Sequence, residues 1–146
     1  MFVRPHLEYA VQAWCPYTAK DINTLEKVQR RFVRQITGIS GSYEEKLKKI
    51  GLTTLEERRI RGDCIEAFKM LKGITGVDPS TWFTKISRAK SAQTRLSSDP
   101  LALEPRKSRL DLRKILAVWN SLPLSIRQSK SVNEFKNSYD RFRAQN

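Results

Sequence analysis

The sequence is short of the residues that most metal and catalytic sites use. It has 1 histidine and 2 cysteines among 146 residues. A structural zinc site takes about four ligands of these types, and most hydrolytic mechanisms rely on an imidazole base. His6 follows Pro5 with no acid or thiol at a suitable spacing, and Cys15 and Cys64 lie far apart in the chain. The sequence therefore predicts no metal site, no cofactor and no catalytic residue, and two reduced thiols with Cys64 in the core.

Long apolar runs are also missing. No stretch approaches the roughly 20 apolar residues that a membrane-spanning helix needs. The first residues contain no apolar segment followed by a small-residue cleavage site of the kind that marks a secretory signal. We therefore expect an intracellular protein, in the nucleus or the cytoplasm, without a membrane partner.

Acidic residues are the third shortage. The chain has 15 Asp and Glu against 28 Lys and Arg, which gives a formal net charge of +13 at pH 7. A protein with this surplus of positive charge attracts polyanions over a long range. The charge therefore favours RNA or DNA as the partner, bound through phosphates.

Helical periodicity dominates the first half of the chain, and no alternating strand of useful length occurs. Apolar residues recur at i, i+3, i+4 and i+7 in segments bounded by capping residues and glycines. The first predicted helix runs from Pro5 to the residue before Pro16. The second is capped by Asp21 and stops at Gly38, and its apolar stripe is Ile22, Leu25, Val28, Phe32 and Ile36. The third has a Ser42–Glu45 capping box and ends at Gly51, and the fourth has a Thr53–Glu56 capping box and ends at Gly73.

The second half is expected to hold less regular structure. A turn around Gly76 and Pro79 precedes Trp82, Phe83 and Ile86, which predict one helical turn packed on the core. Periodicity disappears over residues 87–108, where we expect a basic irregular loop with at most a short extended segment. Two more helices follow, one with Leu112, Ile115, Leu116 and Trp119 as its stripe and one opened by a Ser131–Glu134 capping box. The fold class is thus all-α, a small bundle of about five to seven helices in a single domain.

Four cations share one face of the second predicted helix. Lys27, Arg30, Arg31 and Arg34 follow one another at i, i+3, i+4 and i+7. Like charges so spaced repel one another by a few tenths of a kcal/mol per pair, and an anionic partner would relieve that repulsion. The face is either a row of phosphate contacts or an ordinary solvated helix surface.

A second basic region spans residues 85–114. It holds 9 cations and 3 acids. The nine cations are Lys85 and the eight candidate phosphate-contacting residues Arg88, Lys90, Arg95, Arg106, Lys107, Arg109, Arg113 and Lys114. Arginine forks and lysine charges on a loop suit backbone phosphates, whereas the alternative is a loop that serves no function in this chain. For a third group, Arg58, Arg59 and Arg61, we expect pairing with acids on the same helix.

Trp14, Trp82 and Trp119 each lie on or beside an apolar stripe. Exposed aromatic side chains can stack on nucleic-acid bases. Because of their positions, we interpret all three as core residues rather than base-stacking ones.

Five segments of the chain, in the same order and at matching spacing, resemble the region that follows the catalytic core in non-LTR retrotransposon (LINE) reverse transcriptases of the jockey and chicken-repeat type. They are residues 3–10 (VRPHLEYA), 25–31 (LEKVQRR), 43–47 (YEEKL), 51–59 (GLTTLEERR) and 119–123 (WNSLP). The resemblance implies that the first helix is part of a polymerase thumb and that the remainder is the C-terminal segment that follows it. We therefore expect a single domain with residues 1–86 as a thumb-like helical core, 87–108 as a basic loop and 109–146 as the C-terminal helices. In such elements this region is thought to help hold template RNA or target DNA.

The chain departs from that family in two ways. It has no fingers or palm and no aromatic-x-Asp-Asp motif for metal ions, so we expect no polymerase activity. The helix before Trp119 is also shorter than the family pattern. Two functions therefore remain open: a non-catalytic nucleic-acid-binding module, or an interaction module that docks a protein on an apolar surface left by the missing palm.

Overall fold

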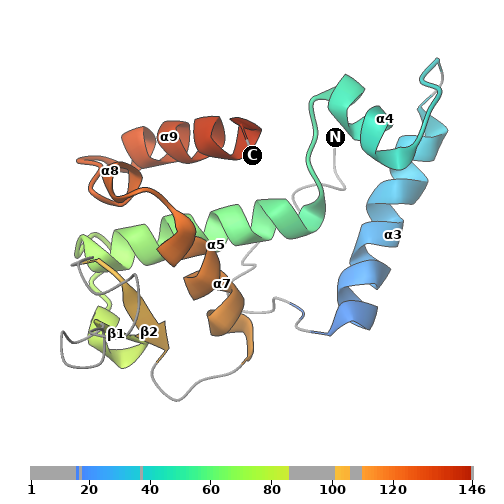
Figure 1. The fold of residues 1–146 in the computed structure, drawn as a ribbon. Coiled ribbons are helices and arrows are strands. Elements are labelled where there is room, and N and C mark those ends of the chain that lie inside the picture. Colours follow the sequence, from blue (N-terminus) through green and yellow to red (C-terminus); the bar gives the residue numbers. More distant parts are fainter. Residues whose placement is uncertain (1–15, 17, 37, 86–100, 106–109, 146) are drawn as a thin grey trace. The chain divides into compact units, whose positions relative to one another are not determined.

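The computed structural model describes residues 16, 18–36, 38–85, 101–105 and 110–145. These residues are mostly helical, so the predicted all-α class is confirmed (Figure 1). The elements are α3 (Ala19–Gln35), α4 (Tyr43–Ile50), α5 (Leu55–Leu71), the 3₁₀-helix η1 (Pro79–Thr81), β1 (Phe83–Lys85), β2 (Leu103–Pro105), α7 (Leu110–Ser121), α8 (Leu124–Arg127) and α9 (Val132–Gln145). The helix predicted between Pro5 and Pro16, with Trp14 and Cys15, lies outside the described residues, as does most of the basic loop 87–108.

The chain divides into two compact units, residues 1–62 and 63–146. The division falls inside α5, whose first turns belong to the first unit and whose remainder belongs to the second. Residues 63–85 therefore pack with the C-terminal helices, whereas the sequence placed them with the preceding helices.

Thr18, and not Asp21, caps α3. The Thr18 hydroxyl accepts a hydrogen bond from the backbone N–H of Asp21 at 3.1 Å and donates one to the Asp21 carboxylate at 2.6 Å. The prediction of an Asp21 cap was wrong by three positions. Asp21 lies within the first turn, where the helix dipole favours its negative charge.

The α4 prediction is confirmed, whereas the capping box of α5 shifts by one residue. Ser42 and Glu45 form the predicted box, and Gly51 ends α4 with a φ of 71°. At α5 the reciprocal bonds join Thr54 and Glu57, at 3.2 and 3.3 Å, instead of Thr53 and Glu56. Both pairs fit the Ser/Thr-x-x-Glu pattern, so contacts with another helix decide the register.

Polar residues fill the buried side of α3. Glu26, Gln29 and Val33 are buried, whereas Val28, which we predicted to be in the apolar stripe, is 43% exposed. The Glu26 carboxylate accepts hydrogen bonds from the Tyr43 hydroxyl and, at 3.1 Å, from the backbone N–H of Leu55. Burial of these polar groups is possible because each has a partner on α4 or at the start of α5.

Gln29 completes this polar cluster. Its side-chain nitrogen donates to the Tyr43 hydroxyl at 3.0 Å and to the Thr53 carbonyl at 3.1 Å. Its side-chain oxygen accepts a hydrogen bond from the Arg58 guanidinium. The engaged Thr53 carbonyl and Leu55 N–H explain why α5 begins at Leu55 and not one residue earlier.

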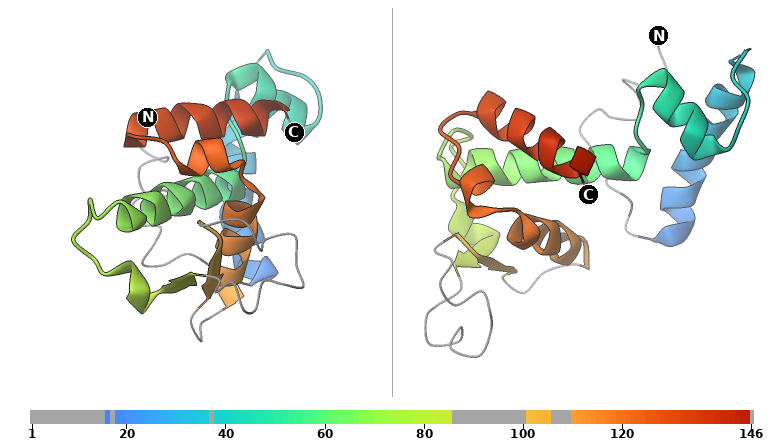
Figure 2. Two further views of the ribbon diagram at one scale, coloured as in Figure 1. Left: turned by 60° about the vertical axis from the view of Figure 1, so that its left-hand side comes forward. Right: turned by 45° about the horizontal axis from the view of Figure 1, so that its top comes forward.

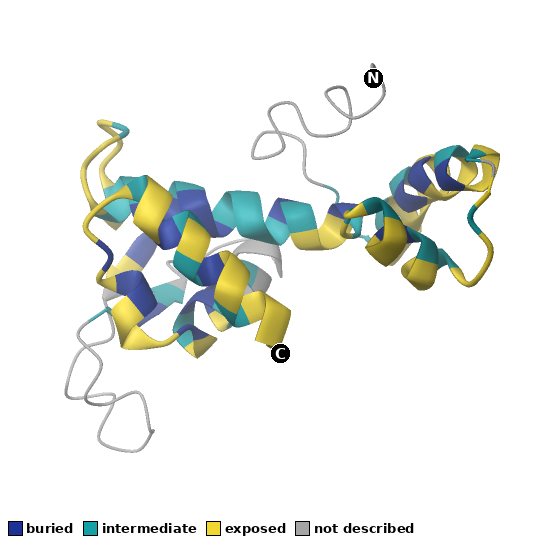
Figure 3. Ribbon diagram, turned by 90° about the horizontal axis from the view of Figure 1, so that it is seen from above, coloured by how far each residue is buried: buried dark blue, intermediate teal, exposed yellow. Residues whose placement is uncertain are grey.

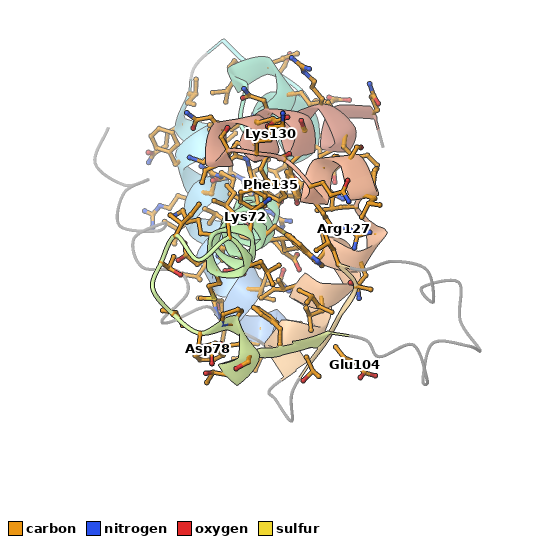
Figure 4. All side chains as sticks on the ribbon, turned by 90° about the vertical axis from the view of Figure 1, so that its left-hand side faces the viewer. Lys72, Asp78, Glu104, Arg127, Lys130 and Phe135 are labelled. Carbon is orange, nitrogen blue, oxygen red and sulfur yellow. The ribbon has the colours of Figure 1, made fainter. Side chains whose placement is uncertain are left out.

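An aromatic cluster forms the core of the second unit. Phe135 of α9 lies 4.5 Å from Phe68 of α5, 6.0 Å from Trp119 of α7 and 6.1 Å from Tyr139, measured between ring centroids. Figure 4 shows Phe135 between α9 and α5, and Figure 3 shows buried residues of this unit where its helices meet. The prediction that Trp119 is a core residue is confirmed, because it is 1% exposed.

The β-strands replace the helical turn predicted at residues 82–86. β1 pairs with β2 in an antiparallel register that places Thr84 opposite Glu104 (Figure 2). Asn120 of α7 fixes β2, since its side chain accepts from the Leu103 N–H and donates to the Leu103 carbonyl, both at 3.0 Å. The short extended segment that the sequence allowed within 87–108 is therefore β2.

Trp82 is exposed, which corrects the prediction that it lies in the core. The side chain is 47% exposed, whereas the next residue, Phe83, is only 7% exposed. The capped 3₁₀-helix at Pro79–Thr81 ends just before these residues, and the chain continues as a strand with side chains on alternate faces. Phe83 takes the inner face, so Trp82 faces outward.

The last two helices include one that the sequence did not predict. α8 begins after Pro123 and buries Ile126 and Arg127, whose Nε donates to the Leu122 carbonyl at 3.0 Å. Ser131 caps α9 as predicted, by accepting from the Glu134 N–H at 3.1 Å, but the Glu134 carboxylate accepts from the Lys130 N–H at 2.8 Å. Residues 132–145 thus form the predicted helix with a modified cap.

Cys64 lies in the core, as predicted, and is 0% exposed. Burial raises the pKa of its thiol from 9.0 to about 12, and the negative charge of Asp63 acts in the same direction. We expect the thiol to resist alkylation at pH 8 until the protein unfolds, because the thiolate is the reactive form. Alkylation of a Cys15→Ser variant, with and without denaturant, measures this, and fast reaction of the folded protein would contradict the assignment.

The same shift gives a pH dependence of stability. The pKa of Cys64 is higher in the folded chain than its ordinary value of 9.0, so its contribution to the free energy of unfolding is complete below pH 9 and declines as the pH rises toward 12. In a Cys64→Ala variant, the decrease in the free energy of unfolding that this thiol causes above pH 9 should be absent.

Candidate nucleic-acid interface

Five exposed cations occupy one side of α3. They are Lys20, Lys27, Arg30, Arg31 and Arg34, and are called here the α3 basic face. The predicted spacing of the last four places them on neighbouring turns. Since Glu26, Gln29 and Val33 are buried, the helix separates a buried polar side from a solvent-exposed cationic one.

The acids of α3 do not neutralise this face. The helix holds two acids, Asp21, which is bonded to Thr18, and Glu26, which is buried against Tyr43 and Leu55. Within the described residues, no hydrogen bond or ion pair joins any side chain of the α3 basic face to an acid. The five charges therefore repel one another without internal compensation, and an anion bound across them would be favoured.

Arg30 makes one contact that the sequence did not reveal. Its guanidinium carbon lies 4.9 Å from the centroid of the Tyr43 ring, at the start of α4. Such a cation–π contact stabilises an exposed arginine by about 0.5–1 kcal/mol. Burial, followed by the hydrogen bond to Glu26, raises the pKa of Tyr43 to about 12, whereas the hydrogen bond from Gln29 acts in the opposite direction.

α4 adds cations that the sequence analysis did not single out. Lys48 and Lys49 are exposed and Lys46 is half-buried. The Lys49 ammonium donates to the Ser40 carbonyl at 3.0 Å. In the sequence, the neighbouring acids Glu44 and Glu45 offset the charge of these lysines. In the structure, Glu45 is held in the Ser42 capping box.

The other predicted site residues belong to a different part of the chain. Arg113 and Lys114 are on α7 in the second unit, and the structure describes their backbone only. The remaining six, Arg88, Lys90, Arg95, Arg106, Lys107 and Arg109, lie outside the described residues. Of the predicted interface, the structure thus brings together Lys27, Arg30, Arg31 and Arg34.

The arginines at the start of α5 are directed inward. Arg58 donates to Gln29, and Arg59 is only 4% exposed. Among the described residues, the Nε and one terminal nitrogen of Arg59 find no hydrogen-bond partner. The expected pairing of Arg58, Arg59 and Arg61 with acids on the same helix stays a prediction.

No helix in the described part of the chain is long and apolar enough to cross a membrane. Over the same residues, no three His, Cys, Asp or Glu side chains gather where a metal ion could be held.

Comparison with known proteins identifies no significant match to this chain. No protein-family model matches the chain, and no significant match was found among the curated proteins or the solved structures.

Proposed function

We propose that this chain is a non-catalytic nucleic-acid-binding module that contacts the phosphates of RNA or DNA through the α3 basic face. The observation that carries the proposal is a helix side with five exposed cations that form no ion pair with an acid among the described residues. The net charge of +13 supplies an attractive field of the same sign around it. An origin in the thumb and C-terminal region of a LINE reverse transcriptase is part of the proposal and rests on the resemblance of the five sequence segments.

The mechanism is electrostatic and independent of base sequence. Arginine forks and lysine ammonium groups bind phosphate oxygens, which carry no base information. Binding releases counterions from the nucleic acid, so the logarithm of the association constant should fall linearly with the logarithm of salt concentration. The basic residues of 85–114 are proposed to add phosphate contacts of the same kind.

Changing Lys27, Arg30, Arg31 and Arg34 together to glutamine tests the site. For a single-stranded ligand each lost phosphate contact reduces the salt slope by about 0.7, so four lost contacts reduce it by about 3. We expect weaker binding to unrelated RNA and DNA sequences at low salt, with helicity unchanged because glutamine is a good helix former. Titration of a single-stranded RNA and a duplex DNA at two salt concentrations, together with circular dichroism, measures both.

A matched control separates position from charge. Lys72, Lys130, Lys136 and Arg141 lie in the second unit, outside the α3 basic face, and their change to glutamine removes an equal number of positive charges. This control should lose much less affinity than the α3 variant. Equal losses in both would show that net charge, and not the α3 basic face, determines binding.

One observation favours the second candidate function, docking of a protein. Ile74, Val77 and Trp82 are 57%, 42% and 47% exposed and lie close together in the sequence. Exposed apolar groups of this kind mark interaction surfaces when they form a continuous patch. Binding through them would change little with salt, so the same two-salt titration distinguishes this function from phosphate binding.

A further inference from the structure

The ring of Tyr43 is held at both ends. Tyr43 is the first residue of α4, directly after the Ser42 cap, so its backbone is fixed by the helix start. At the other end the hydroxyl donates to Glu26 and accepts from Gln29 at 3.0 Å. The ring therefore has a defined position beside α3, and the Arg30 guanidinium lies 4.9 Å from its centroid.

The contact leaves Arg30 able to bind an anion. A cation–π attraction uses the charge of the guanidinium and requires no hydrogen-bond acceptor. All five N–H groups of Arg30 remain available, because within the described residues its side chain has no hydrogen bond or ion pair. A free arginine loses much rotamer freedom when it binds, whereas one already held over a ring loses less.

We propose that Tyr43 is a positioning residue of the nucleic-acid interface, and that its ring holds Arg30 ready for a bidentate contact with one backbone phosphate. This inference rests on the proposed function and deepens it. Arg30 is thereby distinguished from its neighbours on the α3 basic face: Arg31 and Arg34 are exposed, and no aromatic contact to either is found among the described residues. Tyr43 itself acts only through Arg30.

Two substitutions of Tyr43 separate the ring from the hydroxyl. Tyr43→Phe keeps the ring but removes the hydroxyl that anchors it to Glu26 and Gln29, so a folded variant should bind a single-stranded RNA oligonucleotide with an affinity between those of the wild type and Tyr43→Leu. Tyr43→Leu removes the ring and should weaken binding about two- to twelvefold, the factor that corresponds to ordering one long side chain on binding. The salt slope of Tyr43→Leu should stay unchanged because every cation remains, whereas Arg30→Gln should reduce it by about 0.7.

A double-mutant cycle distinguishes positioning from a general structural role. In an Arg30→Gln background, Tyr43→Leu should cost no further affinity, because Tyr43 acts through Arg30. A structural role would weaken binding equally in both backgrounds, and that result would overturn the inference.

A charge-conserving pair keeps the test valid if Tyr43→Leu does not fold. Arg30→Lys loses the planar fork held over the ring and should weaken binding more than Arg31→Lys, which has no ring beneath it. Equal effects of the two would refute the special role of Arg30. If the wild-type protein does not bind RNA at all, the proposed function itself is wrong, whereas binding that depends on the α3 basic face but not on Tyr43 rejects only this inference.

Discussion

Replacing Trp119 with alanine is expected to lower the free energy of unfolding by about 3–5 kcal/mol, as for other large aromatic residues truncated in cores. The side chain is 1% exposed and its ring lies 6.0 Å from that of Phe135. Its indole N–H donates to the Leu101 carbonyl at 3.0 Å, so truncation also removes the partner of that carbonyl. A loss of this size is a large part of the roughly 5–15 kcal/mol by which folded domains are stable.

Trp82 provides the control for this prediction. It is 47% exposed, and surface substitutions usually change stability by less than about 0.5 kcal/mol. Urea unfolding of Trp82→Ala and Trp119→Ala, compared with the wild type, should therefore show one small and one large effect. If Trp119 instead stacked on bases, its removal would weaken single-strand binding by about 1–3 kcal/mol and leave stability unchanged, which would refute the core assignment.

The sequence predicted features that depend on nearby residues. The Ser42–Glu45 box, the stop at Gly51 and the exposed cations of the α3 basic face follow from spacing along one helix. Periodicity places cations on one side of a helix without reference to any other part of the chain. Hence the part of the candidate site on α3 was predictable.

The errors occurred where distant residues decide the structure. Glu26 and Gln29 are polar, so an apolar stripe cannot include them, and their burial depends on hydrogen bonds to Tyr43, Thr53 and Leu55. The same contacts set the register of the α5 cap. The role proposed for Tyr43 could not be predicted either, because nothing in a sequence shows which ring an arginine contacts.

The β1–β2 pair also could not be predicted from the sequence. Each strand has three residues, too few for an alternating pattern to be recognised. Their pairing joins Phe83 to Pro105 across a long stretch of chain. The exposure of Trp82 follows from this pairing, and its position beside a predicted apolar stripe was misleading.

Replacing Glu26 with alanine is the second change with a large expected effect. The carboxylate accepts hydrogen bonds from the Tyr43 hydroxyl and the Leu55 N–H, which joins α3 to α4 and to the start of α5. A hydrogen bond to a charged group contributes about 1.5–3 kcal/mol, and the loss of both should lower the free energy of unfolding by about 3 kcal/mol because neighbouring bonds are not additive. Glu26→Gln should cost less, since its amide oxygen still accepts one bond.

Glu44→Gln is the matched control, because it removes the same charge from an exposed residue of α4. Urea unfolding should show a clear loss for Glu26→Gln and a change of less than about 0.5 kcal/mol for Glu44→Gln. Equal stabilities would show that the buried cluster does not hold the helices together. Binding gives a second test, since Glu26 is buried beside the α3 basic face, four residues before Arg30, and is not exposed to a ligand. Removal of a negative charge should not weaken attraction to phosphates, so folded Glu26→Gln should bind RNA at least as tightly as the wild type. Weaker binding by the folded variant would mean that the position of Tyr43, and with it Arg30, depends on the Glu26 carboxylate.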